Sequence, residues 1–294
     1  MALNDNCYIH PARHWVGRCA DRVVNSRRLA SGRRWLLSRL PFLQLESDVA
    51  NVVYLNWVVP AAQVSHLVPA GMRLLERDGM TIVTELTYNH GHFGPVLAGP
   101  LRSLFPSPAQ SNWRLYVSHL PDGTSAQQTV LFIRNIFDSP LHALATRLFS
   151  DALPSHCAAS FTHQVDGALY ATAIAGGDGS APSLHASVML CNLAELPEDF
   201  QPFFPSWQAA VETLTLQHAA WSAIPGSSAL ACAGIDLPIQ LADVRPAQSV
   251  EVSTGDFLRA LGIRCVPFSF VVPQVKFRVR WEKVWQDGAI LKAP

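Results

Sequence analysis

The chain has 294 residues, of which 49% are hydrophobic and 15% charged, with 22 basic and 22 acidic side chains. A chain of this length and apolar content buries a large core on folding, which excludes an intrinsically disordered protein. The zero net charge gives no overall attraction to nucleic acid, and no nucleic-acid partner is expected.

Basic and acidic residues are unevenly distributed along the chain. Residues 1–40 hold eight arginines and two aspartates, a net charge of +6, so the other 14 basic and 20 acidic residues give −6. Arginine supplies 19 of the 22 basic residues, and the first of the three lysines is Lys276. The six cysteines form no metal-type pair and no disulfide framework, so we expect reduced thiols and a cytoplasmic protein.

Residues 13–40 are predicted to be helical, because apolar residues recur at helical spacing from Trp15 onward. Ser31-Gly32 marks a break between two helices, and Pro41 ends the second. Two interpretations stay open for this arm. It packs on the body and leaves its arginines in water, or it lies on an anionic membrane as a basic amphipathic surface. Peripheral membrane contact through residues 13–40 is therefore one partner hypothesis.

After Val49 the sequence changes to short β-branched and aromatic runs that are separated by proline and glycine. Helices are expected at 61–68 and 140–150, and strands at 51–59, 80–88, 113–119, 130–135, 157–165 and 168–175, with further strands or short helices at 207–216, 230–239 and 268–281. This pattern predicts a mainly β (α+β) protein with an antiparallel β-barrel or double sheet. We expect a basic helical N-terminal arm, residues 1–47, and a single β-rich domain, residues 48–294.

The predicted strand that begins at residue 80 carries three polar candidates. His90 and His92 point to one face of an extended chain and can hold a divalent cation if a third ligand approaches. Structural, hydrogen-bonded histidines are the alternative, because Gly91 permits a bend, and we assign no metal. Glu85 is either a buried general acid or base or an outward-facing carboxylate.

Asn112, Arg114 and Tyr116 share one face of the strand predicted at 113–119. A planar guanidinium beside an amide and a phenol is suited to binding a carboxylate or polarising a carbonyl. The alternative is an arginine that pairs with a neighbouring acid such as Glu85.

Residues 147–157 place Arg, Asp, Ser, His and Cys side chains close together in sequence. No GxSxG motif accompanies them, so hydrolase chemistry has little support. Phosphate-binding glycine motifs, HExxH and EF-hand loops are also absent from the sequence, and no cofactor is expected.

Several short motifs occur in a characteristic order: Tyr54-Leu55-Asn56-Trp57, Val68-Pro69-Ala70-Gly71-Met72, Asp78-Gly79, Asn112 to Val117, and Ala145 to His156. Over about residues 48–248, this order resembles the uncharacterised YqjF-like family of the acetoacetate decarboxylase-like superfamily. The resemblance implies a β-barrel or double-sheet core with a polar central cavity that takes a small molecule.

Acetoacetate decarboxylases form a Schiff base on a lysine that follows a Gly-Arg-Glu…Pro-Lys-Lys segment. The most similar segment here runs from Thr146-Arg147-Leu148 to Pro154, and Ser155 and His156 stand in place of the lysines. Neither side chain can form an iminium, so we expect no Schiff-base decarboxylation. His156 stays a candidate general acid or base, because the pKa of imidazole lies near neutrality.

The functional hypothesis is a cofactor-independent lyase, hydratase or isomerase that acts on a carboxylate or keto compound. His156, Glu85 and Arg114 are the expected catalytic residues, and Asn112, Tyr116, Arg147 and His92 the expected substrate-binding residues. The alternatives are a non-catalytic ligand-binding protein and a membrane-peripheral protein, and a homo-oligomer is possible in each case.

Overall fold

The N-terminal arm forms two helices, as predicted. The computed structural model describes residues 6–264, 266–286 and 289–290. Helix α1 (Trp15–Val24) is followed by α2 (Arg27–Leu37). The break lies before α2 rather than at Ser31-Gly32, because the Ser26 hydroxyl accepts a hydrogen bond from the backbone N–H of Leu29 and caps α2. The division into an arm and a single domain stays a prediction.

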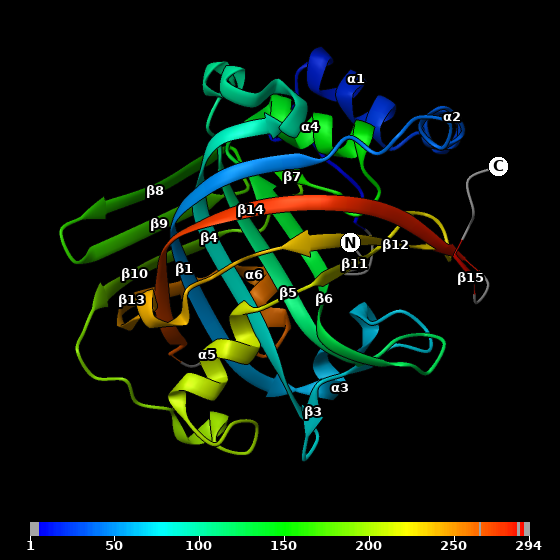
Figure 1. Cartoon of the computed structure of the whole chain (residues 1–294). Coiled ribbons are helices and arrows are strands. Elements are labelled where there is room, and N and C mark those ends of the chain that lie inside the picture. Colours follow the sequence, from blue (N-terminus) through cyan, green and yellow to red (C-terminus); the bar gives the residue numbers. More distant parts are fainter. Residues whose placement is uncertain (1–5, 265, 287–288, 291–294) are drawn as a thin grey trace.

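A closed barrel forms the centre of the molecule (Figure 1). In the described part of the chain it comprises, in spatial order, β1 (Leu45–Pro60), β4 (Met80–Pro95), β5 (Ala109–His119), β6 (Ser125–Phe137), β11 (Ala219–Ala223), β12 (Leu230–Asp236) and β14 (Phe268–Gln286). The length of β14 closes the ring, because residues 268–279 pair with β1 and residues 278–285 pair with β12. Neighbouring strands are antiparallel except β6 and β11.

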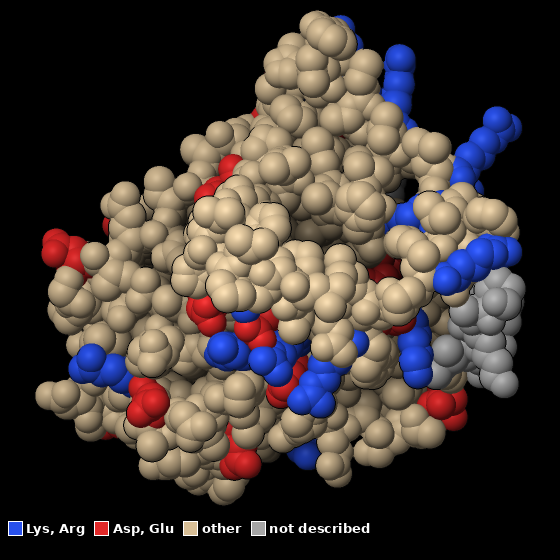
Figure 2. Space-filling view, turned by 45° about the horizontal axis from the view of Figure 1, so that its top comes forward, with Lys and Arg blue, Asp and Glu red and all other residues tan. Residues whose placement is uncertain are grey.

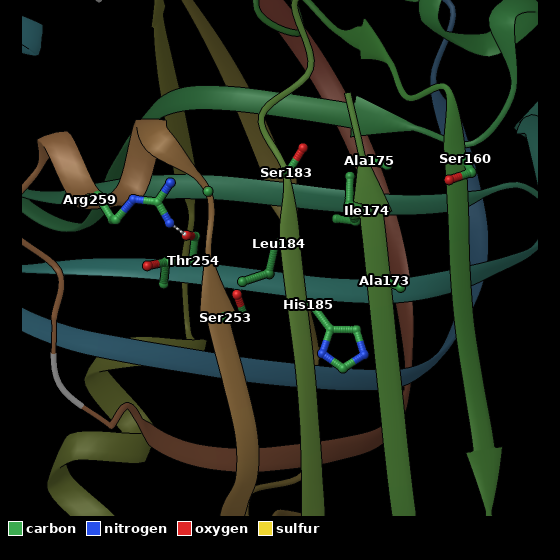
Figure 3. Close-up of a pocket in the computed structure, with 11 residues that line it drawn as sticks. Ser160, Ala173, Ile174, Ala175, Ser183, Leu184, His185, Ser253, Thr254 and Arg259 are labelled. Carbon is green, nitrogen blue, oxygen red and sulfur yellow. Dashed lines mark hydrogen bonds between the residues drawn. The ribbon is translucent and has the colours of Figure 1, made fainter. Parts of the chain in front are cut away.

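A second group of strands extends from β14 and covers part of the barrel. Its order is β13 (Arg245–Thr254), β10 (Leu184–Leu190), β9 (Leu169–Ala175) and β8 (Ser160–Asp166). Figure 3 shows these strands crossing the barrel strands, and β8 contacts both β4 and β5. The sequence patterns did not predict β10 and β13, whose exposed face carries polar residues such as His185 and Glu251.

Short elements connect the strands. The helices are α3 (Ala61–Val64), η1 (Ser65–Leu67), η2 (Val96–Leu104), α4 (Pro140–Phe149), η3 (Glu198–Phe200), α5 (Trp207–Thr215), η4 (Leu241–Asp243) and α6 (Asp256–Ala260), and the short strands are β2 (Arg73–Leu74), β3 (Glu76–Arg77), β7 (His156–Cys157) and β15 (Ala289–Ile290). Among the described residues, every helix is too short or too polar to cross a bilayer.

Both faces of β1, β4 and β5 are buried over most of their length, and the two faces contribute to different cores. On one side, which we call the helix face, Tyr54 and Tyr116 pack in the same core as Leu214 of α5. On the other side, the extension face, Leu55 and Trp113 share a core with residues of β8–β10 and α6. Because side chains alternate along a strand, adjacent residues of β5 enter opposite cores. This alternation decides which of the predicted site residues meet.

Candidate functional site

The structure separates the predicted site residues into four groups. Asn112, Arg114 and Tyr116 lie on the helix face; Glu85 lies on the extension face; His156 and Arg147 lie together near the N-terminal segment; His92 is at the surface. All except His92 are buried. The expected triad of Arg114, His156 and Glu85 is therefore not brought together in one place.

Arg114 is buried among tyrosines on the helix face. Its Nη2 donates to the carbonyl of Leu214 at 2.7 Å, and the Tyr116 hydroxyl donates to the same oxygen at 3.0 Å. The guanidinium carbon lies 5.4 Å from the ring centre of Tyr54. No ion pair in the described chain includes Arg114, and its Nε has no hydrogen-bond partner there. A permanent positive charge in the protein interior is thus surrounded by neutral groups alone. Its desolvation costs on the order of several kcal/mol of folding free energy.

The alternative pairing of Arg114 with Glu85 does not occur. Thr84, not Glu85, lies opposite Arg114 in the β4–β5 ladder, and Glu85 lies opposite Trp113. Residues in register on neighbouring strands share a face, so Glu85 and Arg114 project from opposite sides of the sheet.

Further unpartnered polar atoms lie beside Arg114. Asn112 is two residues earlier on β5, and Asn135 lies opposite it on β6. The Asn112 amide nitrogen donates to Asn135 Oδ1 at 2.5 Å, which leaves Asn112 Oδ1 and Asn135 Nδ2 without partners in the described chain. Together with Arg114 Nε, these atoms offer two donors and one acceptor. Buried polar atoms are normally satisfied, so this group is suited to a small polar ligand or to water.

His90 and His92 do not share a face. The Nε2 of buried His90 donates a hydrogen bond to Gln110 Oε1 at 2.7 Å, and its Nδ1 lies 2.8 Å from Ser47 Oγ. Burial lowers the pKa of His90 to about 4, so its imidazole is neutral at pH 7. His92, the residue after Gly91, has a positive φ of 53° and lies at the surface, where its Nδ1 is 2.9 Å from Asp48 Oδ2. Within the described residues, His, Cys, Asp and Glu side chains form no cluster of three that could hold a metal ion.

Glu85 is only 1% exposed and lies on the extension face. Its Oε1 accepts hydrogen bonds from Ser111 Oγ, at 2.6 Å, and from the Thr87 hydroxyl. Burial raises the pKa of Glu85 to about 7 although both hydroxyls favour the ionised form. A carboxyl group that titrates near neutrality is suited to proton transfer.

We expect Glu85→Gln to stabilise the protein at high pH. The folded pKa, about 7, lies above the reference value of 4.5, so the stability that depends on this group falls as pH rises from 4.5 to about 7. Urea unfolding should show the variant roughly 3 kcal/mol more stable than the wild type at about pH 8, with most of the gain lost at about pH 5. The surface variant Glu195→Gln is the control, and an equal gain at both pH values would contradict the burial of an ionised Glu85.

His156 and Arg147 contact each other beneath the N-terminal segment. Arg147 donates to the carbonyls of Ser155 and Asn6, and its Nη2 lies 3.4 Å from His156 Nε2. The two ring nitrogens of His156 bond Asn6 Oδ1, at 2.5 Å, and Ser180 Oγ, at 2.7 Å. Burial lowers the pKa of His156, and the charge of Arg147 lowers it further. The imidazole is therefore neutral, and both of its nitrogens already have partners.

Register places His156 on the same face as Glu85, although the two do not touch. His156 lies beside Ile136 of β6, Ile136 lies opposite Ser111 of β5, and Ser111 bonds Glu85. Three strand spacings separate the two ends of this row, roughly 14 Å. The extension face therefore carries both proton-transfer candidates, and the helix face carries the anion-binding candidate.

Sequence reasoning missed Asn135, Tyr54 and Leu214, which complete the surroundings of Arg114. A β-bulge between β5 and β6 sets which residue of β6 lies opposite Asn112. Leu214 binds Arg114 through its backbone carbonyl at the end of α5, and any residue type at this position would supply that carbonyl. Neither feature leaves a signal in the local sequence.

A family model that describes uncharacterized conserved proteins, DUF2071, matches residues 47–223. The chain belongs to the DUF2071 family. No curated protein matches this DUF2071 chain in sequence.

Solved structures show which fold the DUF2071 chain has. Acetoacetate decarboxylase from Legionella pneumophila superposes with a TM-score of 0.55 at 11% identity, over 82% of this chain and 87% of that one. The enduracididine biosynthesis enzyme MppR, complexed with pyruvate, gives 0.55 at 12% identity, over 85% and 92%. An acetoacetate decarboxylase-like enzyme from Sphingomonas wittichii RW1 gives 0.50 at 11%, over 80% and 90%. These matches confirm the predicted acetoacetate decarboxylase-like fold.

The described lysines of this DUF2071 chain lie at the surface. Lys276 is 3.8 Å from Glu46, and Lys283 lies over the ring of Trp281. Ser155 and His156, the residues that correspond to the lysine pair of the decarboxylases in the resemblance, are both buried. Lys292 lies outside the described residues, and the absence of Schiff-base chemistry stays a prediction.

A shallow hollow of ≈ 380 Å³ lies on the outer surface of β8–β10 and β13 (Figure 3). Ser183, His185 and Arg259 are among its lining residues. Arg259 already bonds Asp256 and the carbonyl of Thr254, so its charge is compensated. None of the predicted site residues lines this hollow, and we give more weight to the unpaired charge of Arg114 than to the hollow's shape.

Proposed function

We propose that this protein binds a small carboxylate- or keto-containing molecule on the helix face of its barrel, with Arg114 as the anion-binding residue. The observation that carries the proposal is a buried guanidinium with no acidic partner in the described chain, beside unfilled hydrogen-bonding positions on Asn112 and Asn135. A buried charge without a counter-ion lowers stability, so its presence favours a functional role. The pyruvate held by the structurally similar MppR supports this ligand class.

In this proposal the unpartnered atoms receive the two ends of the ligand. A carboxylate would bind Arg114 through Nε and one terminal nitrogen, in place of the neutral Leu214 carbonyl. The amide nitrogen of Asn135 would donate to a keto oxygen, and Asn112 Oδ1 would accept from a hydroxyl group. Tyr116, which shares the Leu214 carbonyl with Arg114, would border the ligand.

A second candidate is a cofactor-independent lyase, hydratase or isomerase. The near-neutral pKa of Glu85 favours it, because a general acid or base works best when it titrates near the working pH. In this version Glu85 is the group that moves the proton, because both ring nitrogens of His156 are bonded and His92 lies at the surface. The separation of these residues from Arg114 favours ligand binding as the first proposal. A cytoplasmic location and a homo-oligomeric state stay predictions.

Isothermal titration with pyruvate and acetoacetate tests the binding proposal, with methyl pyruvate and acetone as ligands that lack the carboxylate. We expect the acids to bind at least roughly tenfold more tightly than the neutral analogues, because an ion–ion contact is lost in the latter. Equal affinity, or no binding of either class, would overturn the proposal.

Proton nuclear magnetic resonance of the same mixtures in heavy water tests the catalytic candidate. Proton transfer at the α-carbon should exchange substrate hydrogens for deuterium, and Glu85→Gln should slow this exchange by roughly 100-fold or more. Binding without exchange or turnover would leave a ligand-binding protein and remove the enzyme candidate.

A further inference from the structure

Large hydrophobic side chains are exposed mainly at one end of the molecule. Of the 21 exposed large hydrophobic residues in the described chain, fifteen lie in residues 15–43, residues 97–105 and α4. These segments lie together at the top of Figure 1, where α4 contacts both α1 and α2, and Phe93, just before η2, lies against His142 of α4. We call this end of the molecule the helical end.

Most large apolar side chains on α1, α2 and η2 are exposed in the described part of the chain. The only buried residue of α1 is Gly17, and α2 buries none. Trp15 is 70% exposed, and on η2 Leu97 and Leu104 are 88% and 79% exposed. Exposed large apolar side chains gathered at one end of a protein mark a place of contact, because they are costly to leave in water.

The helical end also carries an excess of exposed positive charge. Arg18, Arg22, Arg27, Arg28 and Arg39 are exposed and form no ion pair with the described acidic residues. Asp21 is the only acidic residue between residues 13 and 43. Figure 2, which brings the top of the molecule forward, shows a broad uncharged surface with basic side chains projecting beyond its upper and right edges.

The side chains also match the chemistry of a membrane interface. Trp15 and Trp35 are amphipathic aromatic residues of the kind that settle at the level of lipid headgroups. The guanidinium of Arg39 lies over the Trp35 ring, 3.8 Å from its centre, so the cation and the indole can enter the interface as one unit. The surface of η2 adds leucines without charge, which suits insertion between acyl chains.

We propose that the helical end docks on an anionic lipid surface, with Leu97, Leu101 and Leu104 inserted and the arginines of α1 and α2 bound to headgroups. The prediction from residues 13–40 alone is thereby extended to η2 and α4, which sequence reasoning did not include. The proposal is independent of the ligand on the helix face of the barrel, which lies elsewhere in the fold.

Vesicle co-sedimentation of the full chain tests the proposal. We expect binding to vesicles of phosphatidylcholine with phosphatidylglycerol, weak binding to phosphatidylcholine alone, and release by high salt, because the headgroup attraction is screened. Leu101→Asp and Leu104→Asp should each reduce the bound fraction by roughly tenfold, since a carboxylate does not enter the interface. Arg22→Glu should reduce binding to the anionic vesicles only.

Matched controls lie elsewhere on the surface. Leu193→Asp, in the loop after β10, and Arg245→Glu, on β13, change exposed residues of the same types and should leave binding unchanged. Failure of the wild type to sediment with anionic vesicles would overturn the proposal, as would equal losses in Leu104→Asp and Leu193→Asp. Sedimentation velocity adds a third outcome: a dimer that Leu104→Asp converts to a monomer, without vesicle binding, would assign the surface to a second copy of the chain instead.

Discussion

Arg114→Met should abolish keto-acid binding without destabilising the protein. Methionine is similar in length and is suited to the apolar surroundings of Tyr54 and Tyr116, but it cannot bind a carboxylate. The Leu214 carbonyl keeps the hydrogen bond from Tyr116, so the change leaves no orphaned acceptor there. Replacing a buried charge that has no counter-ion by an apolar group is neutral or stabilising, by roughly 1–4 kcal/mol. Titration calorimetry should show at least a roughly 100-fold loss of affinity, and thermal unfolding an unchanged or raised Tm.

Arg147→Met provides the contrast for this experiment. Arg147 is also buried, yet it donates to the carbonyls of Ser155, Pro154 and Asn6, which its removal would leave without that donor. We expect it to lose about 2–3 kcal/mol of stability. If Arg114→Met destabilises the fold as strongly as Arg147→Met, Arg114 has a structural role and the binding proposal loses its principal support.

Glu46→Ala should be strongly destabilising. Glu46 is buried at the start of β1, where it bonds Arg102 of η2 and Arg278 of β14 and lies 3.8 Å from Lys276. Without Glu46, Arg278 has no acidic partner in the described chain, and Arg102 and Lys276 keep only the more distant Asp48, at 3.7 and 4.0 Å. We expect a loss of about 3 kcal/mol in urea unfolding at neutral pH. The same change should loosen the attachment of η2 to the barrel.

The effect of Glu46→Ala should depend on pH. Burial opposes ionisation of Glu46, but its bonds to Arg278 and Arg102 outweigh this and hold its pKa below the ordinary value. A lowered folded pKa contributes stability that is present above the unfolded value, 4.5, and is lost as pH falls through the folded value. The difference between variant and wild type should therefore shrink in acid.

Asp236→Ala is the matched control for Glu46→Ala, because Asp236 forms a single, more exposed ion pair with Arg280. Such pairs contribute about 0–1 kcal/mol. Similar losses in the two variants would show that the arginines around Glu46 do not act as a buried network.

The elements that sequence reasoning located share strong local signals. The β-branched run of β1, the alternating start of β4 and the apolar spacing of the arm each predict their structure from neighbouring residues. The motif order predicted the acetoacetate decarboxylase-like fold. The α1–α2 break was placed wrongly, since a serine cap decided it. Strands β10 and β13 were missed, because their polar faces are stabilised by pairing with each other rather than by a local pattern.

The candidate site could be predicted only in part. Alternation along β5 placed Asn112, Arg114 and Tyr116 on one face, which needs nothing beyond the period of a strand. The same rule could not relate Arg114 to Glu85 or His156, because those relations depend on the register of β4, β5, β6 and β7.

The sequence by itself determined where the β-rich runs lie, the arginine-rich N-terminal segment, the family and the scarcity of lysine. Local spacing and composition carry these properties. The tertiary structure decided that Arg114 has no acidic partner in the described chain, because Glu85 projects from the opposite face of the sheet. It also decided that Asn6 and Ser180 bond the two ring nitrogens of His156, and that η2 lies at the helical end. Each of these depends on contacts between residues far apart in the chain, which are fixed by strand register and packing and leave no mark on local sequence.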